Sequence, residues 1–483
     1  MLGPGDTEKK TPMSDTTHDG QRGQQTAEQR VLDAIDTRAI ADFSMLGKEE
    51  RRLSAEFLQR LISGSRGPQG ELCCPLRIRG ADIVGPLRPP SAMEDEARLA
   101  VQFWDCTFDS PVDLSGARFL VLRFVDCSLP AFIGASLNVS ADLDLSGSVF
   151  SGVTDYTSEL SWVGSGSIHL SNARIGGKLD LSATAQHRLE TSGTVRLDGA
   201  RIDGDVVFNG AKLDGNGDTA LSARSAMIGG NTDLDLGEGH RFEANGEVAF
   251  VAAHIVGDLS CNGASLSNPD GRALHCEDLK VESVFLSADR GADLPFEAHG
   301  RLNFLTAVIG GSFFMTNARL APGPDYQGLL KKGGPVAINL QQARISNALA
   351  VNNIGALQDG VSHSLDEELE PVHGWFLLTG AQVNAVLDNT ATGWPADGYL
   401  DVEGSTYSRI RHVDRGDLAE MRIRWLRRQY PNGKPDAASF RPQPYEQLSQ
   451  VMRQHGQTRE ANVVAVEKIR MRLTAKVDPP WAR

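Results

Sequence analysis

The chain has 483 residues, of which 40% are hydrophobic and 23% charged, and its formal net charge is −14. This composition excludes an intrinsically disordered protein, and the apolar runs are too short for a membrane-spanning helix. The polar N-terminus lacks the apolar core of a signal peptide, which predicts a cytoplasmic location. Six cysteines are too few for a disulfide framework in so long a chain, and strand alternation around Cys106 and Cys127 predicts buried thiols.

The first 70 residues divide into a tail and a helical cap. Residues 1–25 contain almost no apolar side chains, and we expect them to be disordered. Residues 26–43 and 48–64 carry apolar side chains at helical spacings. Two short helices before a repeat array predict an N-terminal cap over residues 26–70, because the open end of stacked repeats must be covered.

From about residue 71 the apolar pattern changes to that of short strands. Large apolar residues first recur every five or six positions, at Phe103, Phe108, Leu114, Phe119, Phe124 and Leu129. A longer phrase then recurs at steps of 26 to 28 residues, with key aliphatic residues at Ile175, Ile202, Ile228, Ile255, Val281 and Ile309. Regular repetition of this length indicates a repeat architecture.

The repeat array is expected to span residues 71–408. The steps from Ile309 to Ile345 and then to Val383 are longer, because polar insertions at 321–334 and 358–373 are expected to form loops outside the stack. This pattern of recurring apolar residues resembles that of pentapeptide-repeat proteins and related right-handed β-helices. The resemblance implies a mainly β fold, a right-handed parallel β-helix or solenoid with short stacked coils.

The C-terminal region, 409–483, is basic and helical in pattern. It contains 16 Lys and Arg against 8 Asp and Glu, whereas the remainder of the chain carries a net charge of −22. Residues 414–430 form a basic amphipathic segment, and residues 441–477 predict two helices joined by a turn at Gly456. The expected hairpin contact joins Tyr445, Leu448, Val451 and Met452 to Val463, Val464, Val466 and Ile469.

A second resemblance rests on phrases of the form GARIxGxLDLSGA followed by PYEQLSQVMRQHGQTREANVVAVEKIR. Together they resemble a family of bacterial proteins commonly labelled membrane-associated oxidoreductases. The resemblance implies a redox activity and a membrane location. Members of that family often carry a hydrophobic segment after this hairpin, and the closing residues KVDPPWAR are not hydrophobic enough to supply one.

The sequence contains no recognisable catalytic or cofactor motif. Gly215, Gly217 and Ala220 match a dinucleotide fingerprint only loosely and lie in a repeat corner, so no cofactor is predicted. The eleven histidines are scattered, so no metal site is predicted.

Stacked carboxylates are the one enzyme-like feature of the array. Aligning the repeats places Asp205 and Asp258 in one outward column and Asp180 and Asp233 in another. A carbohydrate-active β-helix enzyme would need paired carboxylates of this kind. The alternative is a solvated polar face, which any exposed strand requires.

The basic C-terminal helices are the strongest candidates for contact with a protein partner or an anionic membrane surface. The alternative is a capping element whose solvated face happens to be basic. The candidate contact residues are Arg422, Arg424, Trp425, Arg427, Arg428, Lys468, Arg470, Arg472, Lys476 and Trp481.

Three functions remain open from the sequence. The first is a non-enzymatic solenoid scaffold, peripheral at the inner face of the membrane through its basic helices. The second is an enzyme, either an oxidoreductase as the family label suggests or a carbohydrate-active β-helix. The third is an acidic DNA mimic that binds a topoisomerase, supported only by the acidic body; direct binding of nucleic acid is not expected.

Overall fold

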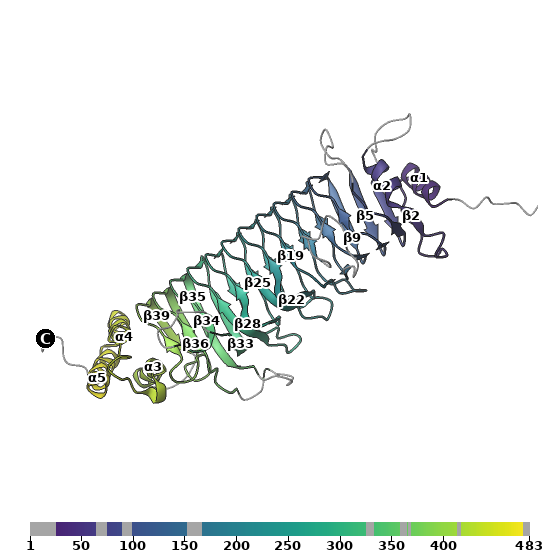
Figure 1. Cartoon of the computed structure of the whole chain (residues 1–483). Helices are drawn as coiled ribbons and strands as arrows, with labels where there is room; N and C mark the ends of the chain where they lie inside the picture. Colours follow the sequence, from purple (N-terminus) through teal and green to yellow (C-terminus); the bar gives the residue numbers. More distant parts are fainter. Residues whose placement is uncertain are drawn as a thin grey trace, which may run out of the picture.

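The computed structural model describes residues 26–63, 75–88, 99–151, 167–324, 333–357, 365, 369–412 and 417–476. These residues form one sheet of 39 strands and five α-helices, so the described chain is mainly β. The helices are α1 (Ala27–Thr37), α2 (Ala55–Ile62), α3 (Leu418–Arg427), α4 (Gln443–Gln454) and α5 (Thr458–Thr474). Figure 1 shows a long stack of strands with α1 and α2 at one end and α3, α4 and α5 at the other.

The N-terminal helices are shorter than the pattern predicts. α1 begins after Thr26, whose side chain accepts a hydrogen bond from the backbone N–H of Gln29. Two short strands, β1 (Ala41–Asp42) and β2 (Arg52–Ser54), occupy positions expected to be helical. They pair in parallel with the first strands of the stack, which buries Ala41 and Leu53, and this pairing outweighs the helical pattern.

Short strands build the N-terminal half of the stack. They are β3 (Leu76–Arg79), β4 (Asp82–Val84), β5 (Ala100–Trp104), β6 (Thr107–Phe108), β7 (Val112–Asp113), β8 (Arg118–Phe119), β9 (Val121–Val125), β10 (Ser128–Leu129), β11 (Phe132–Ile133), β12 (Asn138–Val139), β13 (Leu143–Asp144), β14 (Val149–Phe150), β15 (Ile168–His169), β16 (Arg174–Ile175), β17 (Leu179–Asp180), β18 (Glu190–Thr191), β19 (Val195–Arg196), β20 (Arg201–Ile202) and β21 (Val206–Val207).

The C-terminal half contains longer strands. They are β22 (Lys212–Ser222), β23 (Met227–Ile228), β24 (Thr232–Asp233), β25 (Glu243–Ala249), β26 (His254–Ile255), β27 (Leu259–Ser260), β28 (Ser265–His275), β29 (Lys280–Val281), β30 (Val284–Phe285), β31 (Phe296–Asn303), β32 (Val308–Ile309), β33 (Phe313–Ala321), β34 (Val336–Asn339), β35 (Arg344–Ala356), β36 (Trp375–Leu377), β37 (Gln382–Asp388), β38 (Leu400–Asp401) and β39 (Thr406–His412).

Every ladder between these strands is parallel, and the pairing follows a regular count. The first four strands pair with the strand two places later, as β3 does with β5. From β5 to β18 each strand pairs with the strand four places later, as β10 does with β14 and β11 with β15. β22 pairs with both β18 and β19, so from there the step falls to three. Later mergers reduce the step to two, as between β37 and β39. The first merger joins two short strands of one repeat, β18 and β19, into one long strand of the next.

The aliphatic residues predicted to mark each repeat lie in one buried row. Ile175 pairs in register with Ile202, and Ile202 with Ile228. The row continues from Ile309 through Ile345 to Val383 across the two predicted insertions, which themselves lie mostly outside the described residues. All these side chains are buried, which confirms the predicted period.

Aromatic residues fill the core of the first repeats. The Phe103 and Phe124 rings stack with centroids 5.0 Å apart, and Phe108 meets both at 5.4 and 5.6 Å. Cys106 and Cys127 are buried free thiols beside them, as predicted. Among the described residues no helix is long and apolar enough to cross a membrane.

The final edge of the sheet is covered by α4. Its Gln443 and Gln447 side-chain amides donate to the carbonyls of Ser405 and Tyr407 at 3.2 and 2.9 Å. These bonds satisfy acceptors that the last strand, β39, would otherwise expose. The helical turn at Gly456, with φ of +77°, then reverses the chain into α5, as predicted.

Candidate functional site at the C-terminal helices

A buried ion pair attaches α3 to the sheet. Asp388 ends β37, and the Arg422 Nη1 and Nη2 atoms donate to its two carboxylate oxygens at 2.8 and 2.6 Å. Trp394 Nε1 donates to the same carboxylate at 2.6 Å. Both charged side chains are 0% exposed. Because breaking a buried pair costs about 3–5 kcal/mol, this contact fixes α3 to the last repeats.

An aromatic shell surrounds the pair. The Trp425 ring lies 5.3 Å from that of Trp394 and 6.3 Å from that of Tyr407, measured between centroids. The Arg422 guanidinium lies 5.8 Å from the Trp425 ring, within cation–π range. Burial raises the pKa of the Tyr407 hydroxyl well above its usual value. The aromatic rings therefore pack around an ion pair whose two side chains are 0% exposed.

The prediction of a partner contact is wrong for Arg422 and Trp425. Both side chains are buried and join α3 to the sheet. The buried side of α3 includes Ala419, Arg422 and Leu426, at spacings of three and four that define one helix face. The position of Arg422 between Ala419 and Leu426 on the apolar face of the helix could have indicated that this arginine is buried and needs an acidic partner. The partner, Asp388, was missed.

The α4–α5 hairpin forms as predicted, but α5 is rotated about its axis. Its buried residues are Ala461, Val464, Glu467 and Met471. Glu467 is 3% exposed and accepts a hydrogen bond from Arg427 Nε at 2.9 Å. A carboxylate thus occupies the packed face because α3 supplies its arginine. Of the four aliphatic residues expected to face α4, only Val464 is buried.

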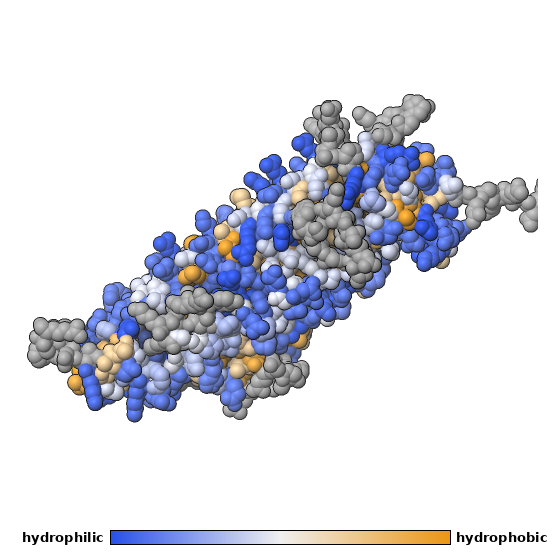
Figure 2. Space-filling model, viewed as in Figure 1, coloured by the Kyte–Doolittle hydropathy of each residue, from blue (hydrophilic) through white to orange (hydrophobic). Residues whose placement is uncertain are grey.

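The rotation leaves an apolar stripe on the outside of α5, formed by Val463, Val466, Ile469 and Leu473. These side chains are 44%, 49%, 54% and 71% exposed. Their spacings of three, three and four place them on one face of the helix. Figure 2 shows small hydrophobic patches at this end of a face that is otherwise mostly hydrophilic.

Cations extend this stripe. Arg459 lies four residues before Val463, and Arg470 lies four residues after Val466, so both share its face. Both arginines are exposed, as is Lys476 just beyond the helix. Arg470 Nη1 lies 3.8 Å from Glu467. The α5 stripe is therefore apolar along its length and basic at both ends.

Most of the other predicted contact residues bind other parts of the chain. Arg428 donates to the carbonyls of Pro395, Thr390 and Ala391, and burial lowers its pKa. The remaining positions are the exposed Arg424, which pairs with Glu420 at 3.2 Å, Lys468, which pairs with Glu446 at 3.0 Å, and the partly exposed Arg472. Trp481 lies outside the described residues.

The first carboxylate column serves the backbone. Asp205 Oδ1 accepts the N–H of Asn231 at 2.8 Å, and Asn231 Oδ1 accepts the N–H of Asp258 at 3.0 Å. A Cβ at Gly230 would lie 2.1 Å from Asp205 Oδ1, so glycine is required for this approach. The column is a ladder of repeat-to-repeat hydrogen bonds.

The members of the second column lie two repeats apart, because Asp180 pairs in register with Val207 and Val207 with Asp233. Asp180 accepts hydrogen bonds from the N–H and hydroxyl of Ser182 and lies 2.8 Å from Lys178 Nζ. Burial, followed by the charges of Asp235 and Asp205, raises the pKa of Asp233 to about 6. No group of three or more His, Cys, Asp or Glu side chains in the described chain is arranged to hold a metal ion.

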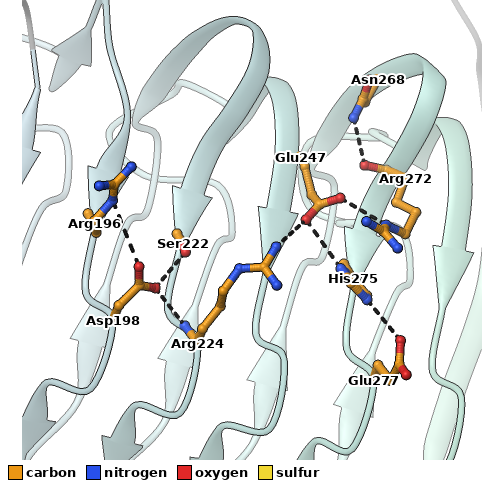
Figure 3. A network of polar contacts seen from close by, with 9 residues as sticks. All are labelled: Arg196, Asp198, Ser222, Arg224, Glu247, Asn268, Arg272, His275 and Glu277. Atoms are coloured by element: carbon orange, nitrogen blue, oxygen red, sulfur yellow. Dashed lines mark hydrogen bonds and ion pairs between the residues drawn. The ribbon is translucent and has the colours of Figure 1, made fainter. Parts of the chain in front are cut away.

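A polar network on the middle of the stack centres on Glu247 (Figure 3). Arg224 Nη2 and Arg272 Nε lie 2.9 Å from its two oxygens, and His275 Nδ1 lies 3.2 Å from Oε1. His275 Nε2 lies 3.2 Å from Glu277. Burial opposes ionisation of Glu247, but hydrogen bonds from His275 and Arg272 outweigh it and lower its pKa to about 2. The network spans β22, β25 and β28.

This network ties three neighbouring repeats together. Each oxygen of Glu247 contacts a cationic or histidine side chain, and these three contacts occupy most of the roughly four acceptor positions of a carboxylate. Its location was not predicted, because Arg224, Glu247 and His275 meet only through the register of the repeats.

Comparisons with known proteins identify no relative: no protein-family model, no curated protein and no solved structure matches this chain. Among the described residues, the α5 stripe is a row of exposed apolar side chains that the rest of the fold does not cover.

Proposed function

We propose that the chain is a right-handed β-solenoid scaffold of the pentapeptide-repeat type, attached to an anionic membrane surface by α5. The regular pairing of each strand with the strand four, three or two places later supports continuous winding. So does the single buried row that runs through Ile175, Ile202 and Ile228. A solenoid offers long faces for other proteins and needs no active site to do so.

The observation that carries the membrane attachment is the unpartnered α5 stripe with its terminal cations. Aliphatic side chains flanked by Arg and Lys are the pattern of helices that lie in a membrane interface. Anionic lipid complements the charge of Arg459, Arg470 and Lys476, whereas the acidic body is repelled. The molecule would then project from the surface by its C-terminal end.

The expected affinity is modest. Full burial of an aliphatic side chain contributes about 1.5–3 kcal/mol, and the four stripe residues are roughly half exposed, so each adds about 1 kcal/mol. Three cations near an anionic surface add about 1 kcal/mol each. The gross gain of about 7 kcal/mol is reduced by the cost of immobilising the protein. Attachment is therefore reversible and sensitive to salt.

Vesicle flotation tests the proposal. Wild-type protein should float with phosphatidylcholine vesicles that contain phosphatidylserine, and less with neutral vesicles or at about 1 M salt, where the Debye length is about 3 Å. The double variant Ile469→Asp, Leu473→Asp should lose flotation. Its matched control is Met227→Asp, Val256→Asp, at positions 51% and 60% exposed on the body. Equal flotation of both variants would refute the proposal.

The oxidoreductase, carbohydrate-active and DNA-mimic functions stay predictions. None has a specific structural observation in its favour beyond those already named in the sequence.

A further inference from the structure

A cavity of about 370 Å³ lies where β39 meets the start of α3 and the end of α4. This volume is at the lower end of the range for small-molecule sites. Its walls come from three elements that the buried Asp388–Arg422 pair and the α4 hydrogen bonds hold together. The cavity therefore lies at the junction between the last strand of the stack and the C-terminal helices.

One wall of the cavity is cationic. Arg409 and Arg411 project from β39, are exposed, and form no ion pair with any described residue. Arg422 also lines the cavity; its Nη atoms hold Asp388, and its buried Nε has no acceptor among the described residues. No lining residue in the described chain is acidic.

A second part of the lining is apolar. Leu448, Val451 and Met452 of α4 line it, and all three belong to the buried core of the cap. Ile410 and Leu418, which are only partly buried, add the apolar surface that a ligand can reach. The complementary ligand is a charged head joined to an apolar body, because each half then meets its own wall.

Helix ends also contribute to the potential in the cavity. Gln457, the N-terminal cap of α5, lines it, so the positive end of that helix lies beside the cavity. The C-terminus of α4 at His455 contributes the opposite sign. Each helix end carries roughly half a charge, so these terms nearly cancel. The two full charges of Arg409 and Arg411 decide the sign.

We propose that this cavity binds an anion, a carboxylate or phosphate, carried on a short aliphatic body. Arg409 and Arg411 hold the head, and the partly exposed Ile410 and Leu418 contact the body, with the buried Leu448, Val451 and Met452 packed behind it. The inference does not depend on membrane attachment by the α5 stripe, because it uses none of the stripe residues.

Titration calorimetry with octanoate tests the inference, with 1-octanol and inorganic phosphate as comparison probes. Octanoate should bind more tightly than phosphate, and octanol should not bind measurably. The double variant Arg409→Ala, Arg411→Ala should bind octanoate at least about tenfold more weakly, since each charge-assisted hydrogen bond is worth roughly that factor. The control Arg424→Ala, an exposed arginine outside the cavity lining, should bind as wild type.

Absence of octanoate binding, or equal binding by the double variant, would overturn the inference. A thermal melt of the double variant checks its fold. Flotation on phosphatidylserine vesicles separates the sources of the anion: loss of flotation in the double variant assigns a lipid headgroup, and unchanged flotation assigns a soluble ligand. Normal flotation without octanoate binding would reject the cavity site and leave the membrane proposal standing.

Discussion

Replacing Asp388 by asparagine tests how the C-terminal cap is held. The change preserves the shape of the side chain but removes the charge that pairs with Arg422. Both residues are 0% exposed, and the guanidinium donates to the carboxylate at 2.6 and 2.8 Å. Leaving one buried charge unpaired costs about 3–5 kcal/mol. We therefore expect Asp388→Asn to destabilise the attachment of α3 by that amount.

The loss should be local, because stacked repeats contact mainly their neighbours. Native-state hydrogen exchange measures it directly. The protection factors of the α3 amides should fall by roughly 100- to 1,000-fold, because each 1.4 kcal/mol of lost stability corresponds to about a tenfold change. Protection in the β9 and β13 strands, far along the stack, should not change.

Two further variants separate charge from packing. Glu420→Gln removes an acidic partner from the same helix, but both members of the Arg424–Glu420 pair are 71% exposed, so the cost should stay below about 1 kcal/mol. Replacing both buried partners, Asp388→Leu with Arg422→Met, should recover most of the lost protection. Unchanged exchange of α3 in Asp388→Asn would refute the claim that this pair anchors the cap.

Three other predictions concern the body of the stack. Glu247→Gln should destabilise the neighbouring repeats by about 2 kcal/mol at pH 7, after allowance for solvent screening. The pKa of Glu247 in the folded protein, about 2, is below the ordinary value, so the wild type should lose this stabilisation as the pH falls from about 5 to 2. Thermal melting curves recorded at acidic pH would show the loss. Burial raises the pKa of Asp233 from its ordinary value of 3.8 to about 6, so its ionisation costs increasing stability between those two pH values and its full amount above about pH 6. Asp233→Asn should therefore stabilise by about 1 kcal/mol at pH 8 but little at pH 4 in the same melts. Burial raises the pKa of the Cys261 and Cys276 thiols, so mass spectrometry should find them unlabelled by a thiol reagent in native protein and labelled in urea; rapid native labelling would contradict their placement.

The parts of the fold that repeat were predictable. A row such as Ile175, Ile202 and Ile228 is visible in the sequence because each residue occupies the same position in each copy, and the structure stacks them in register. The helix–Gly456–helix hairpin was predictable for a similar reason, because its signals are local. Period and turn chemistry need no knowledge of distant contacts.

What escaped prediction depends on contacts between distant residues. Asp388 and Arg422 are 34 positions apart, and neither carries a local motif. The rotation of α5 follows from Glu467, which lies 40 positions from its partner Arg427. A hydrophobicity pattern assigns Val466 and Ile469 to the core. It contains no information about the hydrogen bond from Arg427 of α3 that allows the carboxylate of Glu467 to be buried instead. The exposed stripe on which the proposed function rests is a consequence of that pairing.

The most direct test of the central claim places a reporter on the stripe. A cysteine at position 473, in a chain with Cys73 and Cys74 changed to serine, would carry an environment-sensitive fluorophore; a second sample would carry it at Arg453, exposed on α4. With vesicles containing phosphatidylserine, the account predicts a blue shift and quenching by brominated lipid at position 473 but not at 453. An unchanged spectrum at position 473 would contradict membrane attachment through α5.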